Sequence, residues 1–285
     1  LYSLRNSAKM LIELGQIEEG EARLGETLAG RERTQGRDHR ETSQSYTDLA
    51  LLYHGQGRMS DAAEMFGHVA EIDLALCAPD DPAVARSLYH WAAVLQDSGD
   101  EAQAEKIYRQ ALGVHEERGG TEQAHVASAW NGLGKAVTAR GEYDEAAECF
   151  QRALDMRLRL FGEPHQQTLY SLADFSWFFG TAERYRQCAA MCMRGLDCAR
   201  ALEPVDQVVV HSLLARLGTA RAALGEFDEA EAILLDAWAE LDDPPPAVAR
   251  DDYIGALVFL YEASGDEDQA AAWRELGEEL QASDG

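Results

Sequence analysis

The feature that most constrains the fold is a repeat of 42 residues that runs through the chain. Glycines stand at positions 15, 57, 99, 141, 225 and 265, and Glu183 fills the remaining place in the series. A residue that is small in every copy follows each of these positions five residues later, namely Gly20, Ala62, Ala104, Ala146, Cys188, Ala230 and Ala270. Periods of this length are typical of arrays in which each unit buries its apolar face only against its neighbours.

Two apolar stripes flank the repeated glycine and predict two helices in each repeat. Eleven residues before it, every copy has a large apolar residue: Leu4, Tyr46, Leu88, Trp130, Leu172, Leu214 and Ile254. Further apolar and small residues follow at i+3, i+4 and i+7, which is the spacing of one helical face. Nine residues after the glycine comes a second row, which is large and apolar in Phe66, Tyr108, Phe150 and Leu234 and departs from this at Cys192 and Arg274. We therefore predict an all-α fold of about 14 helices, with a turn at each glycine.

The repeat also divides the chain. One solenoid over residues 1–285 is expected, with its last repeat acting as a polar cap. Because the sequence opens on Leu1, close to the first apolar row, we expect it to be a fragment of a longer protein. The seven predicted repeats cover approximately residues 1–35, 36–78, 79–120, 121–162, 163–204, 205–245 and 246–285.

These rows resemble the tetratricopeptide repeat family over essentially the whole chain. The long period and the phrases G-R-D-H-R-E-T (Gly36 to Thr42) and G-E-P-H-Q-Q-T (Gly162 to Thr168) are similar to the kinesin-light-chain subtype. The resemblance implies a right-handed superhelix whose first helices line a concave groove. It also implies binding of proteins or extended peptides in that groove.

Charge and composition exclude several classes of function. The chain has 51 acidic and 25 basic residues, a formal charge of −26, which disfavours nucleic acid and anionic membranes as partners. No apolar stretch approaches the ~20 residues of a membrane span. An odd number of cysteines, five, in a chain of this length indicates a reducing compartment, so we expect a cytoplasmic protein.

No constellation for catalysis, cofactor binding or a metal is found, and the chain is predicted not to be an enzyme. Cys149, Cys188, Cys192 and Cys198 fall in apolar rows, which predicts buried thiols and no zinc ligands. His39 and His165 share one position just before the first helix of their repeats. That position favours a loop or capping role.

The candidate binding residues lie on the first helices, outside their apolar stripes. They combine cations, amides and aromatic rings, the side chains enriched at binding hot spots. A short acidic or aromatic-plus-acidic segment is the expected ligand of the groove. The predicted site consists of Arg86, Tyr89, His90, Asn131, Lys135, Tyr170, Asp174, Trp177 and Arg216.

Two functional hypotheses remain at this point. The first is a non-enzymatic scaffold that binds a peptide or partner protein in the groove. The second is a regulatory or substrate-docking arm of a larger enzyme, such as a kinase or protease. The strongly acidic end, residues 226–285, has 18 acidic residues against Arg250 and Arg274, and is either a solvated cap or a docking surface for a basic partner.

Overall fold

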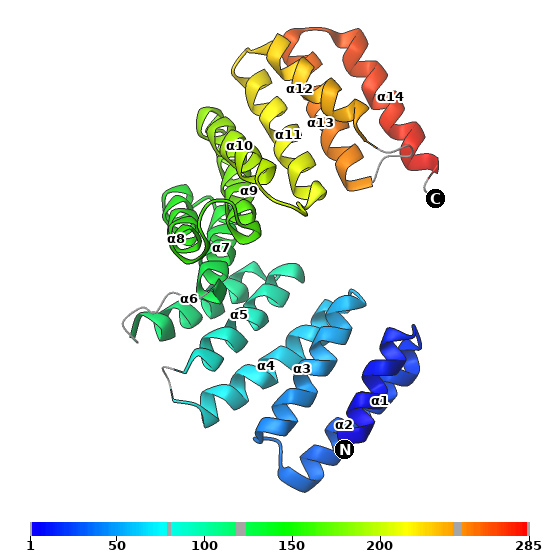
Figure 1. Ribbon diagram of the computed structural model, residues 1–285, viewed down its shortest axis with the longest axis vertical. Coiled ribbons are helices and arrows are strands. Elements are labelled where there is room, and N and C mark those ends of the chain that lie inside the picture. Colours follow the sequence, from blue (N-terminus) through cyan, green and yellow to red (C-terminus); the bar gives the residue numbers. More distant parts are fainter. Residues whose placement is uncertain (1, 79–80, 118–123, 242–246, 284–285) are drawn as a thin grey trace. The chain divides into compact units, whose positions relative to one another are not determined.

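The computed structural model describes residues 2–78, 81–117, 124–241 and 247–283, and these residues form fourteen α-helices and no strand (Figure 1). The prediction of an all-α helical array is therefore confirmed. The helices are α1 Tyr2–Glu13, α2 Ile17–Gln35, α3 Arg40–Gly55, α4 Met59–Leu76, α5 Pro82–Asp97, α6 Glu101–Glu117, α7 Ala124–Ala139, α8 Tyr143–Phe161, α9 Gln166–Thr181, α10 Tyr185–Arg200, α11 Gln207–Ala223, α12 Phe227–Ala239, α13 Ala247–Ser264 and α14 Glu267–Ser283.

The contacts between residues divide the chain into two compact units. Unit 1 is residues 1–142 and contains α1 to α7, and unit 2 is residues 143–285 and contains α8 to α14. The division falls in the turn of the predicted fourth repeat, between α7 and α8. The single solenoid over residues 1–285 stays a prediction, and each unit is described separately below.

Each short turn between paired helices contains one residue in the left-handed backbone region. The φ angles of the repeated glycines lie between +74° at Gly57 and +85° at Gly99, and Glu183 takes the same conformation with φ +56°. Glu183 is the one residue other than glycine with positive φ in the part of the chain that the structure describes. A Cβ atom makes this conformation unfavourable, which explains why glycine fills the other turns.

Replacing Glu183 by glycine should therefore stabilise the protein. We expect the free energy of unfolding to rise by about 1 kcal/mol, because the strain of a side chain in the left-handed region is removed. Urea denaturation measures the change. Gly225→Glu is the reverse substitution, at a position in unit 2 with φ +79°, and should lower the free energy of unfolding by a similar amount. Equal or lower stability of Glu183→Gly would contradict this reading of the turn.

Four of the first helices begin at a side chain that caps the backbone. The Nδ1 atoms of His39 and His165 accept hydrogen bonds from the N–H groups of Glu41 (3.2 Å) and Gln167 (3.1 Å). Asp81 and Asp206 cap α5 and α11 in the same way. The capping role predicted for the two histidines is confirmed, and it satisfies backbone donors at the helix start.

The predicted rows of large and small residues pack against each other. A Cβ atom built on Gly218, which belongs to the small row, would lie 2.4 Å from Cγ of Leu234, and one on Gly132, two residues before the small-row Gly134, would lie 2.2 Å from Cζ of Tyr108. Large side chains of the second helices thus pack directly against backbone of the first helices that follow or precede them. The core also contains the four thiols predicted to be buried, at Cys149, Cys188, Cys192 and Cys198.

Two buried arginines were missed by the sequence analysis. Arg157 on α8 donates to the carbonyl of Gln167 and to Oγ of Ser171, both at 2.9 Å. Arg31 on α2 makes the equivalent bonds in unit 1, to the carbonyl of Glu41 and to Oγ of Ser45. Each arginine ties a second helix to the start of the following first helix.

None of the described helices is long and apolar enough to cross a membrane.

Candidate functional site

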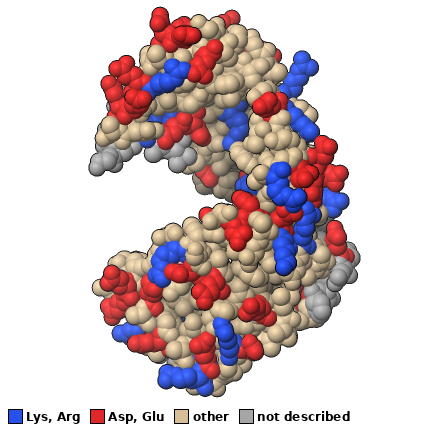
Figure 2. Space-filling model, turned by 180° about the vertical axis from the view of Figure 1, so that it is seen from behind, with Lys and Arg blue, Asp and Glu red and all other residues tan. Residues whose placement is uncertain are grey.

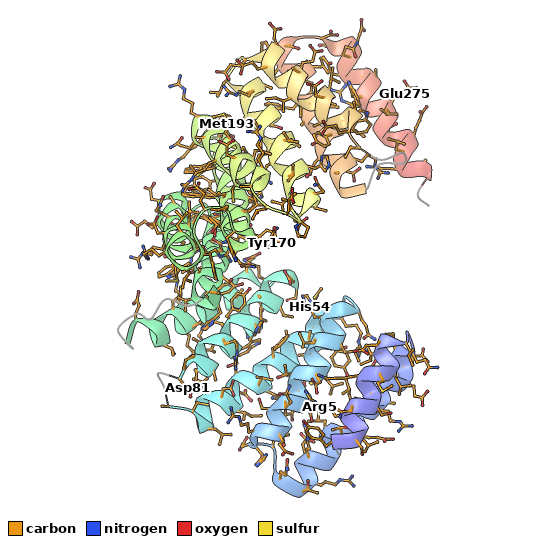
Figure 3. The ribbon with its side chains drawn as sticks, in the orientation of Figure 1. Arg5, His54, Asp81, Tyr170, Met193 and Glu275 are labelled. Atoms are coloured by element: carbon orange, nitrogen blue, oxygen red, sulfur yellow. The ribbon has the colours of Figure 1, made fainter. Side chains whose placement is uncertain are left out.

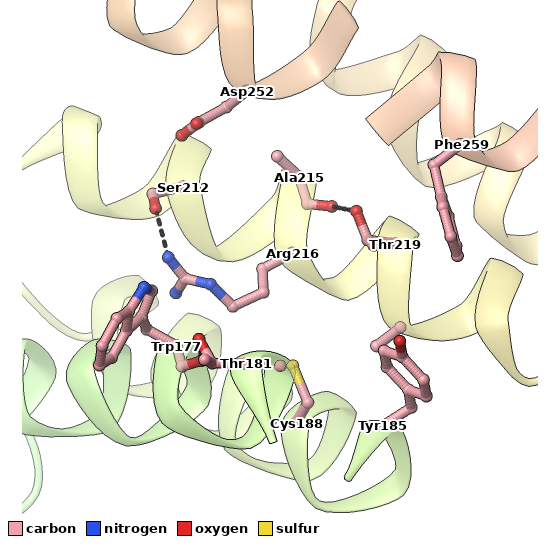
Figure 4. Close-up of a pocket in the computed structure, with 12 residues that line it drawn as sticks. Trp177, Thr181, Tyr185, Cys188, Ser212, Ala215, Arg216, Thr219, Asp252 and Phe259 are labelled. Atoms are coloured by element: carbon pink, nitrogen blue, oxygen red, sulfur yellow. Dashed lines mark hydrogen bonds between the residues drawn. The ribbon is translucent and has the colours of Figure 1, made fainter. Parts of the chain in front are cut away.

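The pocket that contains two of the predicted binding residues in unit 2 lies among α9, α10, α11 and α13. It has a volume of about 390 Å³ and opens between the first helices of consecutive repeats (Figure 4). A cavity of this size suits a side chain or a short peptide segment. Its prominent side chains are Trp177, Tyr185, Arg216, Asp252 and Phe259.

Trp177 forms an exposed aromatic wall of this pocket. The residue is 37% exposed, and its ring meets the ring of buried Phe150 edge-on, with centroids 6.5 Å apart. Phe150 in turn stacks on Phe175, so the indole rests on a rigid aromatic base. An exposed aromatic side chain held in this way can contribute apolar contact to a partner with little loss of conformational entropy.

Arg216 on α11 is held in place by three hydrogen bonds. Nη1 donates to Oγ of Ser176 (2.8 Å) and to the carbonyl of Ala173 (3.2 Å), and Nη2 donates to Oγ of Ser212 (3.0 Å). All these acceptors are neutral, so the guanidinium keeps its positive charge on the pocket wall. Among the described residues Nε has no acceptor, which leaves that edge able to bind an oxyanion.

Asp252 on α13 adds a negative group to the same pocket, and Figure 4 shows its carboxylate above Ser212. Partial burial raises the pKa of Asp252, while the charge of Arg216 acts in the opposite direction and that of Asp251 adds to the rise. The pocket of unit 2 therefore presents both signs of charge beside aromatic surface. Such a mixture suits a peptide better than a purely anionic ligand.

A second pocket lies in unit 1 and contains Arg86 and His90. It has a volume of about 450 Å³ and is bounded by α3, α4 and α5. Tyr89 is half-buried next to it, with its ring 5.1 Å from the ring of His90 and 6.3 Å from that of Tyr108. The structure thus brings Arg86, Tyr89 and His90 together on α5.

The two predicted residues on α7 are less accessible. Asn131 is 5% exposed, and Lys135 is half-buried. A substitution at Asn131 would therefore change packing as well as any contact with a ligand. Its predicted role in holding a peptide backbone stays a prediction.

The remaining predicted residues, Tyr170 and Asp174, are half-buried on α9. The hydroxyl of Tyr170 donates to Oδ2 of Asp206 at 3.0 Å, so this ring joins the start of α11 (Figure 3). Trp177 and Arg216 reach the pocket described above, whereas Tyr170 and Asp174 do not line it. The nine predicted residues are thus divided between the two units.

The acidic end remains largely exposed. Asp251, Asp266, Glu267 and Asp268 are exposed at the start of α13 and of α14, and Figure 2 shows acidic side chains at this end as well as over the rest of the face in view. Within the described ranges, no three or more His, Cys, Asp or Glu side chains are placed to hold a metal ion. The docking role of this end for a basic partner is not tested by these observations and stays a prediction.

The sequence analysis missed several residues of the two pockets. Tyr185, Asp252 and Phe259 line the pocket in unit 2, and Arg40 and Asp73 line the pocket in unit 1. Arg40 is the first residue of α3, before the predicted face of that helix, and Tyr185 and Asp73 lie on second helices, outside the predicted groove. Polar residues near the ends of the helices would have included Arg40, Asp73, Tyr185 and Asp252, whereas no such signal identifies Phe259.

Comparison with known proteins supports the fold. BtubC (BKLC) of P. vanneervenii is 19% identical, with a TM-score of 0.68 over 78% of this chain and 90% of that one. A Rap protein complexed with Competence and Sporulation Factor is 15% identical, with a TM-score of 0.61 over 99% of this chain and 74% of that one. A STAND ATPase with a tetratricopeptide repeat sensor, PH0952 of Pyrococcus horikoshii, is 15% identical, with a TM-score of 0.69 over 97% of this chain and 41% of that one. No curated protein matches the sequence.

The family itself is shown by the sequence. The tetratricopeptide repeat model matches residues 1–75, 83–159 and 125–201, which together make up more than half of the chain. The matched residues contain nearly all of α1 to α10, that is, five helix pairs and their left-handed turns. The chain therefore belongs to the tetratricopeptide repeat family.

Proposed function

We propose that the chain is a non-enzymatic scaffold that binds a peptide segment of a partner protein on the faces of its first helices. Tetratricopeptide repeats are in general protein–protein interaction scaffolds, and the binding surface is the finer part of the proposal. The observation that carries it is the pairing of exposed Trp177 with the fixed guanidinium of Arg216 in one pocket. Aromatic and arginine anchors in pockets dominate the binding energy of most interfaces.

The arrangement favours a segment with an apolar or aromatic side chain next to an acidic one. The apolar side chain would pack on Trp177 and Phe259, and the acid would accept hydrogen bonds from the available edge of Arg216. Because Arg216 is already ordered by Ser176 and Ser212, little entropy is lost when a ligand binds it. Asp252 would disfavour a second acid on the far side of the pocket.

Trp177→Ala should weaken binding strongly. Peptides are first selected from a displayed random library on the unaltered protein, and their affinities are then measured by fluorescence anisotropy. We expect the affinity to fall by at least about tenfold, because the central anchor is lost. The free energy of unfolding should fall by only about 1 kcal/mol, because Trp177 is partly exposed rather than part of the core.

Tyr143→Ala is the matched control. Tyr143 is 38% exposed, and its ring packs edge-on against buried Phe178, much as Trp177 packs on Phe150, but it does not line the pocket. It should leave peptide affinity unchanged. Equal losses of affinity in both variants, or no loss in Trp177→Ala, would contradict the proposed site. Loss of affinity only when the acidic residues of 226–285 are neutralised would instead support docking of a basic partner at that end.

The alternative proposal is a regulatory arm of a larger enzyme. The similarity to PH0952, a STAND ATPase with a tetratricopeptide repeat sensor of which this chain covers 41%, is the observation that favours it. Sequencing the complete gene tests this alternative, because a kinase, protease or ATPase domain in the same reading frame is required. A cytoplasmic location stays a prediction under either proposal.

A further inference from the structure

The pocket in unit 1 has a different chemical character from the pocket in unit 2. Its polar lining comes from α3, with Arg40, Ser43 and Gln44, and from α5, with Arg86, Ser87 and His90. On α4, Phe66, Val69 and Leu76 add apolar surface, and Asp73 adds a carboxylate. The pocket thus combines polar and charged groups of two first helices with apolar surface of the second helix between them.

Arg40 and Arg86 are unusual cations in this protein. Both are exposed, and neither makes a hydrogen bond or a salt bridge to any residue that the structure describes. Among the described Lys and Arg side chains, only Lys106 and Arg186 share this property. In a chain with twice as many acidic as basic residues, an accumulation of two such arginines in one pocket leaves it able to take an external anion.

We propose that this pocket binds a phosphorylated serine or threonine side chain of a partner protein. Two guanidinium groups carry far more N–H donors than the two oxygens of one carboxylate can accept, whereas a phosphate has three strong acceptor oxygens. The amide of Gln44 and the hydroxyl of Ser43 add neutral donors on the α3 side. Arginine clusters with such neighbours are a recurring way to recognise phosphorylated segments.

Two acidic side chains of the pocket, Asp73 and Asp81, affect how it can bind an anion. Asp81 is occupied as the cap of α5, where it accepts the N–H of Ala83 at 2.9 Å. Asp73 on α4 is half-buried, and burial raises the pKa of its carboxyl, while Ser87, Arg86 and Arg40 act in the opposite direction. Asp73 therefore competes with a bound anion for the two arginines, and removing its charge should strengthen phosphate binding.

Burial, together with Arg86, lowers the pKa of His90, so this ring is neutral near pH 7 and adds a hydrogen-bonding group without charge.

The inference rests on the scaffold function proposed above, but it concerns a different pocket. An experiment can therefore contradict phosphate binding in unit 1 without contradicting peptide binding in unit 2, and the reverse. The probes are three bead-bound pools of degenerate peptides that differ only at the central residue: phosphoserine or phosphothreonine, glutamate, and unmodified serine or threonine. Retention of the protein on each pool is measured for the unaltered chain and for three variants: Arg40→Gln/Arg86→Gln, Asp73→Asn, and the matched control Lys106→Gln/Arg186→Gln. The control removes two equally unpaired cations that do not line the pocket.

We expect retention on the phosphorylated pool to exceed that on the other two by at least about tenfold. It should fall to the level of the unmodified pool in Arg40→Gln/Arg86→Gln, rise in Asp73→Asn, and stay unchanged in the control. Equal retention on the glutamate pool would assign the pocket to carboxylates and overturn the proposal. Equal loss in the control variant would show that general charge is responsible, which also overturns it.

Discussion

Replacing Phe150 by alanine is expected to destabilise unit 2 by about 3–5 kcal/mol, the usual cost of removing a buried phenylalanine. Phe150 on α8 is fully buried, and its ring contacts the rings of Phe175, Trp177 and Phe178, with centroids 5.3–6.5 Å apart. Its loss leaves a cavity at the centre of this aromatic cluster. Because Trp177 rests on Phe150, peptide affinity should fall as well. Thermal and urea denaturation measure the stability.

Phe161→Ala on the same helix is the control for this experiment. Phe161 is 36% exposed, and its ring stacks on His165 at 4.3 Å. Its replacement should cost only about 1 kcal/mol, because more than a third of the side chain is already exposed, whereas Phe150 is fully buried. Similar losses in the two variants would show that Phe150 does not have the central position described here.

Gly218→Ala should also destabilise unit 2, by about 1–3 kcal/mol, although alanine is the better helix former. The added Cβ would lie 2.4 Å from Cγ and 2.5 Å from Cδ2 of Leu234, a fully buried side chain on α12. Relief of this clash requires α11 and α12 to move apart. Since α11 also presents Arg216, the pocket of unit 2 should bind its peptide more weakly.

Gly255→Ala provides the opposite expectation within the same unit. Gly255 lies in α13, and a Cβ atom there would meet nothing within 4 Å. Alanine should therefore stabilise the protein by up to about 1 kcal/mol, through helix propensity alone. A destabilised Gly255→Ala, or a stabilised Gly218→Ala, would contradict the packing of α11 against α12. Urea denaturation of both variants decides the matter.

The architecture could be predicted from the sequence because each repeated row has one local physical cause. Glycine recurs where the backbone needs a left-handed turn, and even the exception, Glu183, adopts that conformation. Small residues such as Gly218 recur where a large side chain approaches the helix. The shared position of His39 and His165 likewise predicted a cap, since a helix start must satisfy its N–H groups.

The candidate site could be predicted only in part, because its properties depend on contacts between repeats. Arg5, for example, lies on a first helix, but it forms a salt bridge with buried Asp48 of α3, 43 positions away in the sequence. The neutral partners that hold Arg216 and the absence of partners for Arg86 among the described residues are equally invisible in a single helix pattern. Periodicity identifies which face of a helix a residue occupies, whereas side chains of the neighbouring repeat determine whether its charged group already has a hydrogen-bond or salt-bridge partner.

Hydrogen exchange of the backbone amides, with and without a saturating peptide selected on the unaltered protein, tests the central claim most directly. A peptide bound between Trp177 and Arg216 should slow exchange in α9 and α11, whose local opening it would oppose. The account predicts the largest protection in Gln166–Thr181 and Gln207–Ala223. Protection confined to α12 and α14, with α9 and α11 unchanged, would contradict it.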